Sequence, residues 1–108
     1  WEYLRTLGAD ADLALHHREL LDTVRAWWGR AQAYRAVWAQ DWTALYVQTR
    51  CPVLLMCAPD DVLHPFFERE QALRPDARTW PLTGANFEPD LDAAGTAEAI
   101  RAFLAAAD

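Results

Sequence analysis

The sequence predicts an α/β domain built around two parallel strands, and three observations support this. The apolar run at 52–58 ends at Pro59 and Asp60, and it is too short for a helix and suits a strand buried on both faces. Residues 65–73 then show helical spacing, and a second extended stretch covers 77–82. Parallel strands need a crossover connection, so this strand–helix–strand order favours parallel pairing.

Length and composition narrow the possible functions. The chain has 108 residues, enough for one domain at most, and a formal charge of −6. An acidic chain argues against a nucleic-acid or anionic-membrane surface. All ten basic residues are arginines, and the sequence contains neither lysine nor serine. This polypeptide alone therefore cannot complete chemistry that needs a serine nucleophile or a lysine Schiff base.

The two cysteines and the hydropathy pattern indicate the compartment. Cys51 and Cys57 are six residues apart on one predicted strand, about 20 Å in extended chain and beyond disulfide reach. We interpret them as reduced core residues, which fits a reducing compartment. No apolar run approaches the ~20 residues of a membrane span, and no signal peptide is recognisable. A cytoplasmic protein without membrane contact is expected.

The first half of the chain, residues 1–48, is predicted to be helical. Residues 1–8 have the character of an irregular lead-in, and a helix begins near Asp10, capped by Asp10 or Asp12. Gly29 is expected to interrupt it, and further helical stretches follow at 31–38 and 42–46. The spacing predicts that the first helix has one apolar face, formed by Leu13, His17, Leu20, Val24 and Trp27.

Four of the six tryptophans fall within this helical half: Trp27, Trp28, Trp38 and Trp42. One interpretation is that they form a helical core or lie over the sheet. The other is an aromatic lid over an apolar pocket, because indoles bury a large area at low entropic cost. On the second interpretation Trp27, Trp28 and Trp38 are candidate substrate-binding residues.

Polar side chains follow both predicted strands and indicate a site at the carboxyl edge of the sheet, where ligands of open α/β sheets bind. Asp61 follows the first strand and Asn86 the second, so we expect the two to lie close together. A carboxylate beside an imidazole is half of a proton-transfer arrangement, but an amide cannot act as a general base. His64, in the same loop as Asp61, is either a surface residue or lines the pocket.

The remaining stretches complete the domain, which we place at 49–108. Residues 88–92 are predicted to form a capping loop, and a last helix is expected at 93–107. The sequence contains no glycine-rich phosphate loop and no histidine or cysteine cluster with metal-ligand spacing, so neither a cofactor nor a metal is expected.

Residues from about Thr49 onward resemble the last quarter of an α/β-hydrolase. The stretch 51–61, with Pro65 four residues after Asp61, matches the family's penultimate strand and acid loop. The family's Gly-x-His-Phe loop is represented here by 84–87, and its closing Phe-Leu by 103–104. The resemblance implies the C-terminal fragment of that fold, with a cap-like segment before it. It makes Asp61 the triad acid, with Asp60 the second choice, and Phe87 a substrate-binding residue.

The resemblance implies part of an enzyme acting on a small, largely apolar ester, lactone, epoxide or haloalkane. Its nucleophile is expected before Trp1, in a missing N-terminal part of the same fold on the same or a separate chain, because no Gly-x-Ser-x-Gly elbow is present. Asn86 stands in the histidine position, which impairs hydrolysis. Three explanations stay open: an engineered replacement, a natural loss of the base, or a register in which His64 or another group supplies it. The alternative function is a non-catalytic or non-hydrolytic binding or interaction protein on this scaffold.

Overall fold

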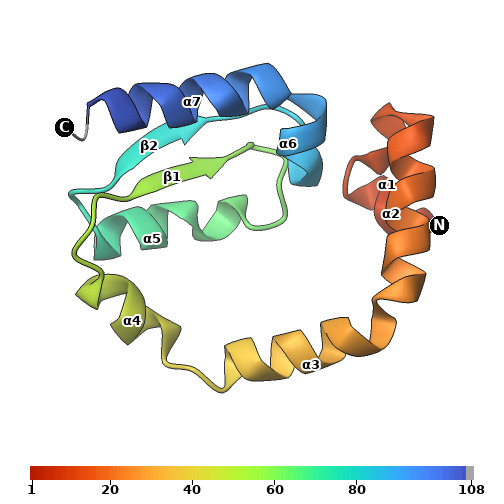
Figure 1. Cartoon of the computed structure of the whole chain (residues 1–108), viewed down its shortest axis with the longest axis horizontal. Helices are drawn as coiled ribbons and strands as arrows, with labels where there is room; N and C mark the ends of the chain where they lie inside the picture. Colours follow the sequence, from red (N-terminus) through yellow and green to blue (C-terminus); the bar gives the residue numbers. More distant parts are fainter. Residues whose placement is uncertain (107–108) are drawn as a thin grey trace.

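In residues 1–106, which the computed structural model describes, helices surround a two-stranded parallel sheet (Figure 1). The elements in chain order are α1 (Glu2–Thr6), η1 (Ala9–Ala11), α2 (Leu13–Arg25), α3 (Trp27–Trp38), α4 (Trp42–Gln48), β1 (Leu54–Cys57), η2 (His64–Phe66), α5 (Phe67–Leu73), β2 (Arg78–Pro81), η3 (Ala85–Phe87), α6 (Glu88–Leu91) and α7 (Ala93–Ala105). The mixed α/β class that the sequence predicts is confirmed.

The two strands pair in parallel, in a register that places Leu54 opposite Arg78 and Cys57 opposite Pro81. They are shorter than the predicted 52–58 and 77–82, because the ladder runs over only four residues of each strand. Burial on both faces was wrong for β1, whose four residues are only half-buried. Among the described residues the sheet order is β1–β2, so the second edge of β1 has no neighbouring strand to cover it.

Helices α5 and α7 lie on opposite sides of the strand pair (Figure 1). The helix predicted at 65–73 begins with the 3-10 turn η2, which has a proline in its first turn, and continues as α5. The predicted capping loop at 88–92 was wrong, since 88–91 form α6. Asp92 alone caps α7, accepting hydrogen bonds from the Gly95 N–H and the Thr83 hydroxyl, each at 3.0 Å. The predicted end of the last helix at Ala107 lies outside the described residues.

The N-terminal half is helical as predicted, with two corrections to its boundaries. The irregular lead-in at 1–8 was wrong, because Glu2–Thr6 form α1. The interruption at Gly29 was also wrong: the chain bends at Ala26, and Gly29 lies within α3. Glycine costs only about 1 kcal/mol in an exposed helix, so it does not end one by itself. The cap at Asp12 is confirmed, since its carboxylate accepts the Leu15 N–H at 2.7 Å.

The buried face of α2 differs from the predicted one. Leu15 and His16 are buried, whereas Leu13 and Val24 of the expected face are 64% and 69% exposed. The reason is the fold of the lead-in, because α1 and η1 pack on the side of α2 that carries Leu15 and His16, and of the predicted face Leu20 joins the margin of this core. His16 stacks on Trp1 with a ring-centroid distance of 3.9 Å, so it is part of this packing.

A small core joins the N-terminal helices to the loop that follows β2. Leu4, Ala9 and Leu15 pack on Phe87, with Leu7, Leu20 and Leu91 at the margin. The Asn86 N–H donates to the Leu7 carbonyl at 3.3 Å, and Arg18 contacts Asp90 at 2.9 Å. Residues 1–25 are therefore docked on the C-terminal half, while α3 crosses from α2 to α4 without burying any of its residues (Figure 1).

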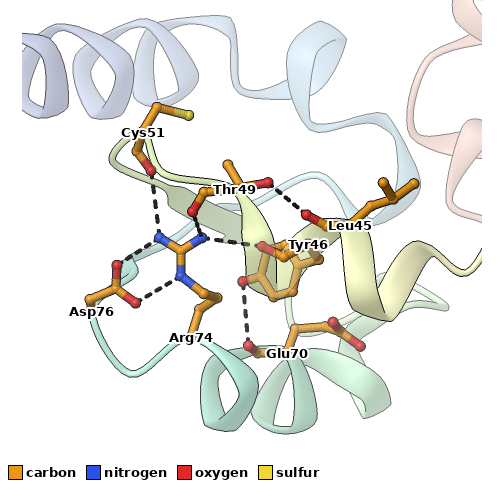
Figure 2. A network of polar contacts seen from close by, with 7 residues as sticks. All are labelled: Leu45, Tyr46, Thr49, Cys51, Glu70, Arg74 and Asp76. Carbon is orange, nitrogen blue, oxygen red and sulfur yellow. Dashed lines mark hydrogen bonds and ion pairs between the residues drawn. The ribbon is translucent and has the colours of Figure 1, made fainter.

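Arg74, directly after α5, holds the other end of the helical segment (Figure 2). Its guanidinium donates to the carbonyls of Tyr46 at 3.2 Å, Thr49 at 2.7 Å and Cys51 at 3.5 Å. A bidentate contact to Asp76, at 2.7 and 2.8 Å, completes the fork and holds the pKa of that carboxyl below its usual value. The Tyr46 hydroxyl adds a bond to the Glu70 carbonyl at 3.3 Å. One side chain thus joins the end of α4, the entry to β1 and the α5–β2 turn.

We expect Arg74→Lys to lower the melting temperature by about 5–10 °C, because an ammonium keeps the charge but cannot serve three carbonyls and a carboxylate together. Circular dichroism during thermal unfolding measures the change. Arg25→Lys is the matched control, since Arg25 lies on an exposed face, 3.9 Å from Asp22. Equal melting temperatures for the two variants would contradict the role given to Arg74.

Candidate functional site

An elongated groove of about 780 Å³ lies beside β1. Leu55 and Met56 of β1 line it, together with the aromatic residues Phe66 of η2 and Phe67 of α5. The end of α3 and the start of α4 supply the other margin, with Trp38 and Trp42. A cavity of this size with mostly apolar walls is typical of small-molecule sites.

The loops after the two strands meet at one end of this groove, as the sequence predicts. The Asn86 amide oxygen accepts a hydrogen bond from the Val62 N–H at 3.3 Å, and Val62 directly follows Asp61. Asp61 in turn accepts the Leu63 N–H at 2.5 Å, which closes a tight turn. Gly84 enters the second loop with φ = 108°, where a side chain would collide with Leu91. Hydrogen bonds from backbone N–H groups to side-chain oxygens therefore join the two loops and close the first of them.

Two carboxylates and one thiol lie close together at this end of the groove. The Cys57 sulfur and one carboxylate oxygen each of Asp61 and Glu88 all lie within 4.8 Å of one another. A hydrogen bond holds Glu88 in this cluster, because its carboxylate accepts the Ala58 N–H at 3.1 Å at the carboxyl end of β1. Among residues 1–106 neither Asp61 nor Glu88 forms an ion pair with an arginine or histidine.

This environment keeps Cys57 protonated. Burial raises the pKa of the Cys57 thiol, and the negative charges of Asp61 and Glu88 raise it further. A thiolate, and not a thiol, is the nucleophile and the metal ligand. The three groups have the spacing to hold a cation, but the raised pKa opposes metal binding by the sulfur near neutral pH. The arrangement is better suited to accepting hydrogen bonds through its carboxylates than to nucleophilic chemistry at Cys57.

The structure separates the residues that the sequence singled out. Asp61 and Trp38 line the groove. Trp27 and Trp28 instead line a second, shallow hollow of about 270 Å³ on the exposed surface of α3. His64 is exposed and stacks on Phe67, with ring centroids 6.0 Å apart. Phe87 lies in the core under the N-terminal helices and not in the groove.

Cys57 and Glu88 are the members of the cluster around Asp61 that sequence reasoning missed. Cys57 was interpreted as a core residue, and Glu88 was placed in a capping loop. The register of the strands could have pointed to Cys57, because it is the last residue of β1, at the edge where the loops meet. Glu88 has no such signal, since its contact with Ala58 spans 30 residues of sequence.

Comparison with known proteins leaves the family of this chain open. The sequence matches no family model, no curated protein and no solved structure. The resemblance to the α/β-hydrolases therefore stays a prediction from the residue pattern. Within the part of the chain that the structure describes, no helix combines the length and the apolar character that crossing a bilayer demands.

Alkylation rates measure the electrostatics of the cluster. With iodoacetamide at pH 8, we expect the alkylation rate of Cys57 to be at least about tenfold lower than that of exposed Cys51. Mass spectrometry of the peptides measures both rates. Asp61→Asn removes a negative charge, lowers the pKa of Cys57 and so accelerates its alkylation at this pH several-fold. Asp60→Asn is the matched control and leaves the rate unchanged. If both variants accelerated the alkylation of Cys57 equally, the specific effect of the Asp61 charge on Cys57 would be contradicted.

Proposed function

We propose that the groove binds a small, largely apolar molecule that presents a hydrogen-bond donor to Asp61 and Glu88. The observation that carries this proposal is the juxtaposition of an apolar channel with two carboxylates that have no cationic partner among residues 1–106. Aliphatic and aromatic walls supply most of the binding free energy, and a few polar groups fix the orientation. A hydroxyl, amine or amide N–H at one end of the ligand fits the carboxylates.

Binding without hydrolysis is the function that the geometry supports best. Asn86 has no titratable nitrogen, and its amide oxygen already accepts the Val62 N–H. Cys57 is held as a thiol, and the chain has no serine. Each of these features takes away a participant that covalent hydrolysis needs, whereas none of them hinders the binding of an apolar ligand.

A neutral naphthylamine probe tests the binding, because its fluorescence rises on transfer to an apolar site. We expect Trp38→Ala to weaken probe binding about five- to tenfold, since this indole lines the groove. Trp27→Ala is the matched control: Trp27 lies on the same helix, is 71% exposed against 78% for Trp38, and lines the separate hollow. Equal losses in the two variants would place the probe outside the groove and contradict the proposal.

The second candidate is part of an α/β-hydrolase-like enzyme with Asp61 as its orienting acid. The observation that favours it is the contact between the two loops, which puts Asn86 next to the residue after Asp61, where the family's histidine would stand. This candidate needs a nucleophile from outside these 108 residues, on the same polypeptide or on a separate chain. Its substrates would be small apolar esters, lactones, epoxides or haloalkanes.

Restoring the base distinguishes the two candidates. In the full-length protein, the hydrolase candidate expects Asn86→His to create hydrolysis of an aryl ester, because an imidazole would then face the carboxylate of Asp61. Asn86→Gln is the matched control, since it keeps an amide and should stay inactive. A His variant that binds the apolar probe but hydrolyses no ester would leave binding as the function.

A further inference from the structure

A continuous apolar stripe on α3 is exposed along the whole helix. It consists of Trp27, Ala31, Tyr34 and Trp38, and we call it the α3 stripe. On a helix of 3.6 residues per turn these positions fall within about 60° of one another. The three aromatic residues are 71%, 46% and 78% exposed. An aromatic surface of this kind on a soluble chain marks a site of association.

The accessible area of the whole molecule is larger than that of a compact protein of the same mass. It is 7854 Å², whereas a compact protein of 12.3 kDa exposes about 6,100 Å². The radius of gyration is 15.7 Å, against about 13 Å for a compact chain of this length. The excess of about 1,700 Å² per chain is more than the ~800 Å² that each partner contributes to a standard interface. This excess belongs to the whole chain, and the exposed aromatic side chains of α3 contribute to it.

The order of residues in the stripe makes it complementary to itself. Its spacing of four, three and four residues is the same from either end. In an antiparallel pair of α3 helices related by a two-fold axis, Trp27 faces Trp38 of the other copy and Ala31 faces Tyr34. Near the two-fold axis the Tyr34 ring of one copy thus meets the small Ala31 side chain of the other. The hollow that Trp27, Ala31 and Tyr34 line lies at this place. Heptad-like spacing of this kind is what antiparallel helix pairs use.

Helix α3 carries two charged residues, Arg30 and Arg35, and both lie beside the stripe. Arg30 and Arg35 lie about 60–80° from its centre, so both point toward the margin of the contact. Arg30 also lies over the Tyr34 ring, 5.7 Å from its centroid. We propose that this protein forms a two-fold symmetric dimer through the α3 stripe, with the two α3 helices antiparallel. Every side chain in such an interface is used twice, as closed two-fold symmetry requires.

Sedimentation equilibrium on the whole chain, from about 1 to 200 µM, measures the dimer affinity. We expect association that ends at the dimer. Ala31→Trp should weaken it tenfold or more, because a second indole opposite Tyr34 overpacks the contact although it adds apolar surface. Ala36→Trp is the matched control on the opposite face of α3 and should leave the affinity unchanged. Far-UV circular dichroism checks that both variants keep their helices.

Other outcomes would overturn the dimer. These are a monomer throughout the concentration range, association that continues past two chains, or tighter association of the Ala31→Trp variant, which would indicate non-specific contact. A monomer that co-sediments with anionic vesicles would assign the stripe to a membrane surface instead. The two-fold pairing also requires that Trp27→Ala and Trp38→Ala weaken the dimer equally, about 30-fold or more. Only Trp38→Ala affects the groove, so a failed dimer and a failed groove are distinguishable.

Discussion

The guanidinium of Arg74 is the interaction on which the placement of the groove depends. Arg74 donates to three carbonyl groups in the last turn of α4 and in the segment before β1 (Figure 2). Because the same side chain is bound to Asp76 in the α5–β2 turn, moving α4 away from the sheet would break these hydrogen bonds together. The wall that carries Trp42 and Tyr46 is therefore held at a defined distance from β1.

The second fixed point lies at the opposite end of the helical segment. Phe87 packs under Leu4 and Leu15, and this anchors α1 and α2 on the loop that carries Asn86. Helix α3 spans the distance between these two anchors and has no buried residue of its own (Figure 1). Its aromatic residues are consequently available to solvent, to a ligand or to another chain. Trp38 belongs to both proposals, since one side of it lines the groove and it also ends the α3 stripe.

Much of the fold was predictable because it depends on local patterns. The apolar run at 52–58, the helical spacing at 65–73 and the cap at Asp12 are short-range signals, and each is confirmed within a few residues. Proximity of the two loops was also predictable, since parallel strands end at the same edge. The buried face of α2 was not, because the packing of α1 and η1 against this helix decided which of its residues are covered.

The sequence by itself determined the α/β class, the parallel order of the strands, and an acidic chain without lysine or serine. These follow from periodicity and composition, which act over a few residues or over the whole chain. Only the tertiary structure decided that Glu88 joins Asp61 and Cys57, that Phe87 is a core residue, and that Trp38 reaches the groove while Trp27 and Trp28 do not. The physical reason is that each of these depends on contacts between segments far apart in the chain, which no local pattern encodes.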